Sequence, residues 1–456
     1  MISISFEQGT LLVSNLQPEH EAILAEWVTF DNRSDCWRAK ALDYRSIVMM
    51  LHRQKIPYQD AAKEFQHIDL KHVGEMTPRY YQQQALDAWW KSGGCGVVVM
   101  PTGSGKSFLA NLCMLKVKRS TLVVVPTIDL MYQWVNQLEK FFNRKIGMLG
   151  GGNKDVQDIT VSTYDSAVIQ MEYIGNRFGF VVFDECHHLP GPVNRNSALM
   201  SIAPFRLGIT ATPERNDGGE AVLYELLGHL AYRIEIDQLE GKVLSPYETV
   251  RFAVGLDKDE QEQYDYYRKV YTDFLKRARI DFSRDGWSQF IIQSCRQPGG
   301  KEALKAFMEQ KRIARTCRSK FTKIWEILVL HAGERIIVFT ADNNTAYELG
   351  NRFLMPVITH HTKGAERKRF LDQFRSGDYK VLITSKVLNE GVDVPEASVG
   401  IVVSGTGSTR EHVQRLGRIL RPSKNKQAVL YELISEGTSE IYVSERRRQH
   451  RAYYRK

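Results

Sequence analysis

Cysteine is scarce in this sequence and is never clustered. The chain has six cysteines among 456 residues, and no two of them form a Cys-x-x-Cys pair. A disulfide framework and a zinc or iron–sulfur site both depend on closely spaced cysteines. The sequence therefore indicates neither kind of site, and it favours a reducing, intracellular setting.

Long apolar runs are also missing. No run reaches the roughly 20 residues that a membrane-spanning helix needs. The first residues, MISISFEQGT, have neither the basic start nor the apolar stretch of a secretory signal. Internal repeats at solenoid periods and low-complexity tracts are absent as well. We therefore expect an intracellular protein, in the cytoplasm or at the nucleoid, without a membrane partner.

The charge balance is basic. The net charge is +9 and the pI is near 9.1, which favours an anionic partner such as nucleic acid. Solvated lysines alone would explain the same balance, so the charge does not decide between these readings. The length suits about two to four domains.

Short apolar runs rich in β-branched residues recur along the chain, with amphipathic stretches between them. Alternation of this kind predicts α/β domains built on parallel sheets. The predicted strands lie at 96–100, 121–126, 159–163, 180–184, 335–340, 380–385 and 399–404.

The two batches of strands predict two α/β domains separated by a region of different character. Residues 258–325 carry basic helical patterns with interleaved aromatics, and a solvated face would explain them equally well. The domain boundaries that we predict are 1–76 for a small N-terminal domain, 77–240 for the first α/β domain, 241–330 for a linker with a helical insert, and 331–456 for the second α/β domain with a basic tail.

The segment PTGSGKS, residues 101–107, follows a predicted strand and opens a predicted helix. Gly103 and Gly105 allow backbone amides to turn around phosphate oxygens, Lys106 reaches the terminal phosphates, and Ser107 offers a hydroxyl to Mg²⁺. The strict pattern GxxxxGK[ST] has glycine where this chain has Met100. The strand–loop–helix context nevertheless predicts a P-loop that binds ATP.

The segment DECHH, residues 184–188, follows an apolar strand. Asp184 is suited to hold Mg²⁺, and Glu185 is suited to polarise an attacking water. A metal cage is the poorer reading because neighbouring residues that leave a strand point to opposite sides. A Cys186 nucleophile with His187 as its base lacks an orienting third group nearby.

The ordered set PTGSGKS, DECHH, LGITATP (207–213) and QRLGRILRP (414–422) resembles the motifs of superfamily 2 helicases and translocases. The resemblance covers about 78–435 and implies two RecA-like motor domains with ATP and Mg²⁺ as cofactors. Within that superfamily the chain resembles the XPB family, particularly its archaeal-type short members. The features that carry this resemblance are the N-terminal block, the combination of VPTxxLxxQW with TATP, and the basic insert, which sits where the family has its thumb.

The resemblance implies roles for individual residues. Those implied for ATP binding, with adenine read by the first two, are Arg79, Gln82, Thr102, Gly103, Ser104, Gly105, Lys106, Ser107, Gly391 and Asp393. Those implied for catalysis are Glu185, Gln414 and the arginine fingers Arg418 and Arg421. Those implied for coupling are Thr210 and Thr212, and those implied for DNA contact are Thr127, Thr163, Arg215 and Thr384.

Two segments depart from the family pattern or match it weakly. The family often has an Arg-Glu-Asp triplet after TATP, whereas this chain has Arg215, Asn216 and Asp217, so the middle carboxylate of the triplet is replaced by an amide. The N-terminal block matches the family's damage-recognition domain weakly, and Trp37 in it suits a core anchor better than a wedge between bases.

The function predicted from these features is an ATP-dependent helicase or translocase on duplex or forked DNA, in repair or in transcription-linked DNA opening. The alternatives are an RNA helicase, a motor subunit of a restriction or nuclease complex, and a scaffold with a vestigial ATP site. The intact set of motif residues argues against the scaffold. The family resemblance also implies a nuclease as a partner.

Overall fold

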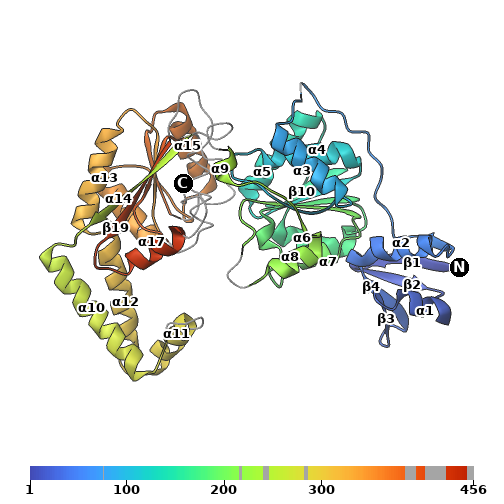
Figure 1. Ribbon diagram of the computed structural model, residues 1–456, viewed down its shortest axis with the longest axis horizontal. Coiled ribbons are helices and arrows are strands. Elements are labelled where there is room, and N and C mark those ends of the chain that lie inside the picture. Colours follow the sequence, from blue (N-terminus) through green and yellow to red (C-terminus); the bar gives the residue numbers. More distant parts are fainter. Residues whose placement is uncertain are drawn as a thin grey trace. The chain divides into compact units, whose positions relative to one another are not determined.

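The computed structural model describes residues 1–74, 76–214, 218–239, 246–281, 286–385, 397–405 and 428–448, without the side chains of 446–448. The chain divides into two compact units, the first spanning Met1–Leu239 and the second containing the described residues after it. Each unit contains a predominantly parallel, helix-flanked sheet (Figure 1). None of the helices in the described ranges combines the length and apolarity needed to cross a membrane.

The N-terminal part of the first unit is a small five-stranded sheet in the order β3-β4-β2-β1-β5, with one parallel pair, β1 and β5. Its core includes Ile4, Leu11 and Ile47, which are fully buried. Its elements are β1 (Ile2–Glu7), β2 (Thr10–Ser14), α1 (Pro18–Leu24), β3 (Val28–Asp31), β4 (Cys36–Lys40), α2 (Tyr44–Arg53) and β5 (Tyr58–Asp60).

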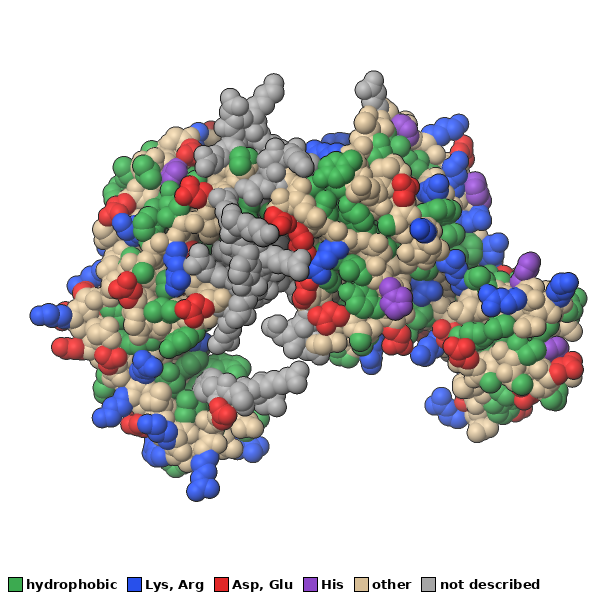
Figure 2. Space-filling model, in the orientation of Figure 1, with side chains coloured by type: hydrophobic (Ala, Val, Ile, Leu, Met, Phe, Trp, Pro, Cys, Tyr) green, Lys and Arg blue, Asp and Glu red, His purple; other side chains and the backbone are tan. Residues whose placement is uncertain are grey.

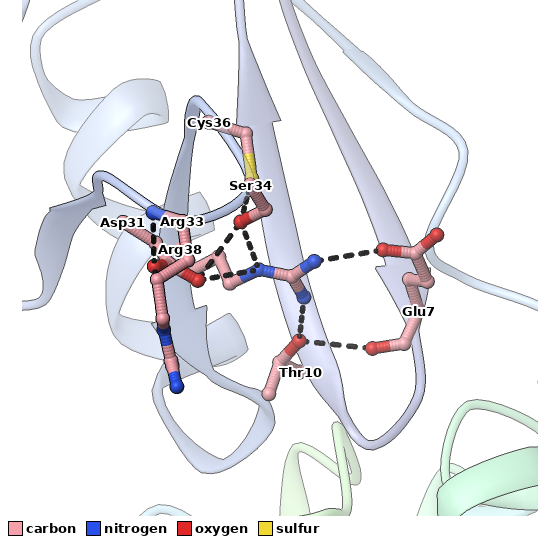
Figure 3. A network of polar contacts seen from close by, with 7 residues as sticks. All are labelled: Glu7, Thr10, Asp31, Arg33, Ser34, Cys36 and Arg38. Atoms are coloured by element: carbon pink, nitrogen blue, oxygen red, sulfur yellow. Dashed lines mark hydrogen bonds and ion pairs between the residues drawn. The ribbon is translucent and has the colours of Figure 1, made fainter.

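One arginine of β4 links its own strand to β1, β2 and β3 on the surface of the small sheet (Figure 3). Arg38 donates to Glu7 Oε2 at 3.0 Å, to Thr10 Oγ1 at 2.8 Å and to Ser34 Oγ at 3.3 Å, and its Nε lies 3.6 Å from Asp31 Oδ2. Because its donors are engaged by neighbours within the sheet, Arg38 holds the strand ends in register.

Trp37 packs against the core of the small sheet while part of its ring stays accessible, and Phe30 meets it edge-on with ring centroids 5.2 Å apart. A ring held in this way is an anchor for the β3–β4 hairpin. The structure thus places Trp37 in the role of a core anchor.

The larger sheet of the first unit has the order β13-β6-β12-β11-β7-β10-β8-β9, and only β8 and β9 pair antiparallel. In Figure 1 helices α3, α4 and α5 cover one face and α6, α7 and α8 cover the other, so the central strands β6, β7, β11 and β12 are almost wholly buried. The strands are β6 (Cys95–Val99), β7 (Thr121–Val125), β8 (Gly147–Gly150), β9 (Asn153–Asp155), β10 (Ile159–Thr163), β11 (Phe180–Asp184), β12 (Phe205–Thr210) and β13 (Leu230–Arg233). The helices are α3 (Tyr80–Lys91), α4 (Lys106–Val117), α5 (Ile128–Phe142), α6 (Tyr164–Ile174), α7 (Asn196–Leu199), α8 (Glu220–Leu227) and α9 (Ile236–Leu239).

The second unit has an all-parallel sheet in the order β14-β19-β18-β15-β17-β16. Its strands are β14 (Tyr247–Val254), β15 (Ile336–Phe339), β16 (Val357–Ile358), β17 (Val381–Thr384), β18 (Val399–Val402) and β19 (Ala428–Ser435). Its helices are α10 (Lys258–Arg277), α11 (Gly286–Arg296), α12 (Gly300–Arg315), α13 (Arg318–Leu330), α14 (Asn343–Phe353), α15 (Gly364–Ser376) and α17 (Glu440–Arg448).

All seven strands predicted from the sequence are present. The structure departs from the predicted boundaries around the insert, because β14 pairs along its whole length with β19 and α13 packs on the core of the same sheet. Both elements therefore belong to the second α/β domain and not to the linker and insert predicted at 241–330. The insert proper is α10, α11 and α12, which leave and re-enter this domain.

The insert is a pair of packed helices, α10 and α12, with α11 at its outer end (Figure 1). An aromatic cluster of Phe274, Phe290 and Phe307 forms its own small core. Lysine and arginine side chains gather towards the outer end (Figure 2). Exposed basic residues there include Lys276, Arg277, Arg279, Arg296, Lys301 and Lys305.

Candidate ATP-binding and hydrolysis site

The loop between β6 and α4 has the backbone of a phosphate cradle. Gly103 and Gly105 adopt φ values of 83° and 85°, in the left-handed region that glycine enters without strain. A Cβ at Gly105 would also lie 2.5 Å from Gln82 Nε2. The loop leads directly into α4 at Lys106, so the helix N-terminus adds its partial positive charge to the cradle.

Two side chains from α3 support this loop from behind. Tyr81 donates its hydroxyl to the carbonyl oxygen of Ser104 at 2.7 Å, and Gln82 Nε2 donates to the same oxygen at 3.1 Å. Gln82 Oε1 in turn accepts from the backbone N–H of Arg79 at 3.0 Å. Arg79 and Gln82 are thus brought to the loop, as the predicted nucleotide site requires, while their reading of adenine stays a prediction.

The polar side chains of the loop are directed partly inward. Ser104 Oγ donates to Pro101 O at 2.6 Å, and Thr102 Oγ1 is buried without a hydrogen-bond partner among the described residues. Lys106 Nζ lies 3.4 Å from Met100 O, at the end of β6. Ser107 is the second residue of α4. The predicted phosphate-binding residues therefore share one loop and one helix end.

Asp184 is the last residue of β11 and is buried, with 6% of its surface exposed. Its Oδ1 accepts from the backbone N–H of Glu185 at 2.9 Å, and its Oδ2 accepts from Trp134 Nε1 at 2.8 Å. Burial and the Glu185 charge raise the pKa of Asp184 to about 6, against the opposing effect of Lys106. Carboxylate and hydroxyl oxygens are the ligands that Mg²⁺ prefers, so Asp184 and Ser107 fit this ion in chemistry.

Glu185 is held by a network that reaches the next strand. It adopts a left-handed backbone with φ 45°. Thr210 Oγ1, at the end of β12, donates to Glu185 Oε2 at 3.2 Å, and His187 Nδ1 lies 3.0 Å from the same hydroxyl. The backbone N–H of Thr212 also points to Thr210 Oγ1, at 3.2 Å. The two residues predicted to couple the ATP site to DNA therefore connect to Glu185 through one hydroxyl group.

The other readings of DECHH fit the structure less well. Cys186 is fully buried, and this burial together with the neighbouring carboxylates raises the pKa of its thiol well above its usual value, which is the opposite of what a thiolate nucleophile needs. Cys186, His187 and His188 form a single 3₁₀ turn. The described part of the chain contains no group of three or more potential metal-binding side chains.

The predicted DNA-contact threonines have different surroundings. Thr127 and Thr163 cap the N-termini of α5 and α6 by accepting from Leu130 N at 3.2 Å and from Ser166 N at 3.3 Å. Because β7 and β10 are parallel neighbours, both helix N-termini lie at one edge of the sheet. Thr384 is fully buried and donates to the carbonyl oxygen of its own neighbour at 3.2 Å, so its DNA contact stays a prediction.

Several predicted residues lie outside the described residues. They are Arg215, Asn216, Asp217, Gly391, Asp393, Gln414, Arg418 and Arg421. Their roles stay predictions from the family resemblance.

Trp134 is the site residue that sequence reasoning missed. It lies in α5 with its ring buried. The spacing of Met131, Trp134, Val135 and Leu138 is typical of a buried helix face, and it predicts only that the ring points inward. The partner, Asp184, is 50 positions away in the sequence, so no local pattern could have identified the contact.

Three family models match the chain. The damage recognition domain of xeroderma pigmentosum group B helicase matches residues 4–62, the res subunit of type III restriction enzymes matches 75–215, and the ERCC3/RAD25/XPB C-terminal helicase matches 301–452. The N-terminal match supports the damage-recognition-like domain that the sequence suggested only weakly.

Curated relatives match most of the chain. DNA 3'-5' translocase XPB2 of Sulfurisphaera tokodaii is 41% identical over 81% of this chain and 84% of its own length. DNA 3'-5' helicase XPB of Mycobacterium tuberculosis is 31% identical over 81% of this chain and 63% of its own length. The general transcription and DNA repair factor IIH subunit XPB of Dictyostelium discoideum is 29% identical over 84% of this chain and 46% of its own length.

Among solved structures, the helicase domain of Hef from Pyrococcus furiosus superposes with a TM-score of 0.54 at 19% identity, covering 81% of this chain and 98% of that one. At this identity the likeness concerns the fold alone. Taken with the 41% identity to an XPB2 translocase and the two XPB family models, the matches show that this chain belongs to the XPB family of helicases and translocases.

Proposed function

We propose that the chain is an ATP-dependent motor that translocates along or opens duplex or forked DNA, in DNA repair or in transcription-linked DNA opening. The observation that carries the proposal is the hydrogen-bonded set of Glu185, Thr210 and His187 beside the P-loop. Relatives named as DNA 3'-5' translocase and DNA 3'-5' helicase support the choice of DNA.

The residues of the first motor domain supply most of the chemistry that ATP hydrolysis needs. The loop amides and Lys106 hold the phosphates, and Glu185 orients the attacking water and receives its proton. Asp184 and Ser107 would hold Mg²⁺, which supplies positive charge to the phosphate oxygens when bound with the nucleotide. The predicted fingers Arg418 and Arg421 would stabilise charge on the departing phosphoryl group.

Contacts to DNA are expected mainly at phosphates. The N-termini of α5 and α6 present backbone N–H groups beside Thr127 and Thr163, and helix N-termini favour anions. The basic outer end of the insert is a second surface of the right charge. Binding through phosphates does not depend on base sequence and weakens steeply with salt.

The experiment that tests the proposal is a steady-state ATPase assay. Rates are compared without nucleic acid and with single-stranded DNA, duplex DNA, forked DNA and duplex RNA, each at two salt concentrations. We expect the strongest stimulation with duplex or forked DNA and a loss of stimulation at high salt. A preference for RNA would identify an RNA helicase instead, and no stimulation by any DNA would overturn the proposal.

Two variants tie the activity to this site. Lys106→Ala should lose ATP binding, because the cation that neutralises the phosphates is removed. Glu185→Gln should bind ATP but not turn it over, because an amide cannot accept the proton of water. Equal ATP affinity in wild type and Lys106→Ala would contradict the assignment.

A nuclease partner is a finer part of the proposal that rests on family resemblance. Co-purification of the natively expressed chain, followed by a nuclease assay on forked DNA, tests it. The motor activity proposed above does not depend on that outcome.

A further inference from the structure

The indole of Trp134 donates its only hydrogen bond to the side chain of Asp184. The bond is 2.8 Å long, and both groups are buried, Trp134 with 1% and Asp184 with 6% of its surface exposed. Trp134 comes from α5 and Asp184 from the end of β11, so the bond joins a helix to the strand end beneath it.

The Asp184 carboxylate is fixed at both oxygens. The backbone N–H of Glu185 donates to Oδ1 at 2.9 Å, while Trp134 donates to Oδ2. The hydroxyl of Tyr164 donates to the backbone oxygen of Asp184 at 3.2 Å. A terminal carboxylate rotates easily about χ2, and donors to both oxygens select one orientation of its plane.

A buried tryptophan usually finds some acceptor for its N–H group, so the bond alone does not establish a role. Trp89 illustrates the ordinary case. It is fully buried in the same domain and donates to the backbone oxygen of Arg206 at 3.0 Å. That acceptor is held by β12 regardless of Trp89. The acceptor of Trp134 is instead a rotatable side chain at the predicted metal position.

We propose that Trp134 is a positioning residue that sets the orientation of the Asp184 carboxylate for the divalent cation of Mg·ATP. This inference rests on the proposed function, because it requires the site to bind nucleotide together with Mg²⁺. Groups that orient metal ligands typically change metal affinity or activity 10- to 100-fold when they are removed.

The test is nucleotide binding without turnover. The affinity for a fluorescent, slowly hydrolysed ATP analogue is measured in Mg²⁺ and in EDTA, and the ratio of the two dissociation constants gives the Mg²⁺ enhancement. In Trp134→Phe the enhancement should fall about 10-fold or more, while the affinity in EDTA stays within about 2-fold of wild type. The matched control, Trp89→Phe, loses a buried N–H donor and the same ring volume and should keep the wild-type enhancement.

A second variant keeps the ring volume. Replacing Trp134 with β-(3-benzothienyl)alanine exchanges the N–H for sulfur in a ring of nearly the same shape, so we expect this variant to fold as wild type does and to lose only the hydrogen bond to Asp184. We expect this variant to show the same reduced Mg²⁺ enhancement as Trp134→Phe. The same replacement at Trp89 should change nothing in this ratio.

The outcomes separate the inference from the function on which it rests. If wild type binds nucleotide with Mg²⁺ enhancement and the benzothienyl variant has an equal enhancement, Trp134 has no positioning role and the inference is overturned. If wild type itself shows no Mg²⁺ enhancement, the proposed Mg·ATP site is wrong, and the inference falls with it.

Discussion

At the scale of single residues, the hydroxyl of Thr210 connects Glu185, His187 and Thr212 by hydrogen bonds. Its hydroxyl has one proton, and its contacts are Glu185, His187 and two groups of Thr212. If the proton goes to Glu185, the hydroxyl oxygen is left to accept from His187 Nδ1 and from the backbone N–H of Thr212. A single side chain thus holds the proposed water-orienting carboxylate and the segment that follows β12.

Thr210→Val keeps the branched shape but removes this hydroxyl. We expect kcat of the DNA-stimulated ATPase to fall about 10- to 100-fold, since a hydrogen bond to a charged group is worth about 1.5–3 kcal/mol. KM for ATP should change little, because Thr210 does not lie on the phosphate loop. Steady-state kinetics measure both constants.

The matched control is Thr121→Val. Thr121 is buried at the start of β7, where its hydroxyl donates to Arg119 O at 2.8 Å, at the opposite end of the strand from the site. Its kcat should equal that of wild type. An unchanged kcat in Thr210→Val would show that the Thr210 hydroxyl does not contribute to ATP hydrolysis.

Lys311 in the insert provides a prediction on pH. Burial, with a smaller effect of Arg315, lowers the pKa of Lys311 from its usual 10.5 to about 8. Between pH 8 and 10.5 the folded state therefore binds fewer protons than the unfolded state. Below pH 8 the charged Lys311 side chain lowers the free energy of unfolding, and this destabilisation disappears as the pH rises from 8 to 10.5. The rings of Phe307 and Trp287 lie 4.1 and 5.7 Å from its ammonium group and partly offset the cost.

Lys311→Met should consequently stabilise the chain at pH 7 and lose that advantage by about pH 10. Because the Lys311 side chain is only half-buried, we expect the free energy of unfolding at pH 7 to rise by about 1 kcal/mol and no more. Urea unfolding at the two pH values measures the difference. A less stable variant at pH 7 would mean that the aromatic contacts outweigh the cost of burial.

At the scale of elements, a buried ion pair attaches α17 to the second sheet. Lys320 of α13 is fully buried, and its ammonium group lies 2.6 Å from Glu440 Oε2 and 2.8 Å from Val403 O. Glu440 Oε2 also accepts from the backbone N–H of Ser435 at 3.1 Å. One lysine therefore connects a helix, the end of a strand and the start of α17.

Glu440→Gln should destabilise the second unit strongly, because it leaves the Lys320 charge buried without its counter-ion. Breaking one partner of such a pair typically costs about 3–5 kcal/mol. The double variant Lys320→Met with Glu440→Leu should be more stable than Glu440→Gln, since no charge is then buried. Urea unfolding gives both values, and equal stability of the two variants would show that the charge is not the cause.

At the scale of the whole molecule, contacts of Arg45 join the N-terminal domain to the first motor domain. Arg45 Nη1 donates to Gly93 O and to Pro204 O, both at 2.7 Å, and its guanidinium lies 5.6 Å from the ring centre of Phe205. Arg206 reaches back to Leu42 O at 3.4 Å. These contacts hold the damage-recognition-like domain in a defined place beside the first motor domain.

Arg45→Ala should weaken the contact between the two domains without affecting the core of the first motor domain. Loss of charge-assisted hydrogen bonds worth about 1.5–3 kcal/mol each should speed amide hydrogen exchange in β1 and β2 by 10-fold or more. Exchange in β7 and β11 should stay as in wild type. Equal protection of β1 and β2 in both proteins would show that other contacts hold the domain.

Local features were readable from the sequence alone. The seven predicted strands, the P-loop, the DECHH segment and the order of the motifs all depend on the periodicity and chemistry of neighbouring residues, because backbone conformation and the geometry of a tight loop are set over a few positions. Those features were enough to predict two α/β domains and to choose Lys106, Asp184 and Glu185, while the assignment as motor domains came from the family resemblance of the ordered motifs.

Only the tertiary structure decided which distant segments meet. The pairing of β14 with β19, the packing of α13 on the same sheet and the bond from Trp134 to Asp184 each join residues that no local pattern relates. Such contacts are selected by the joint burial of many side chains and by the closure of long loops. For this reason the sequence by itself determined the chemistry of the site, while the tertiary structure decided how its carboxylates are held.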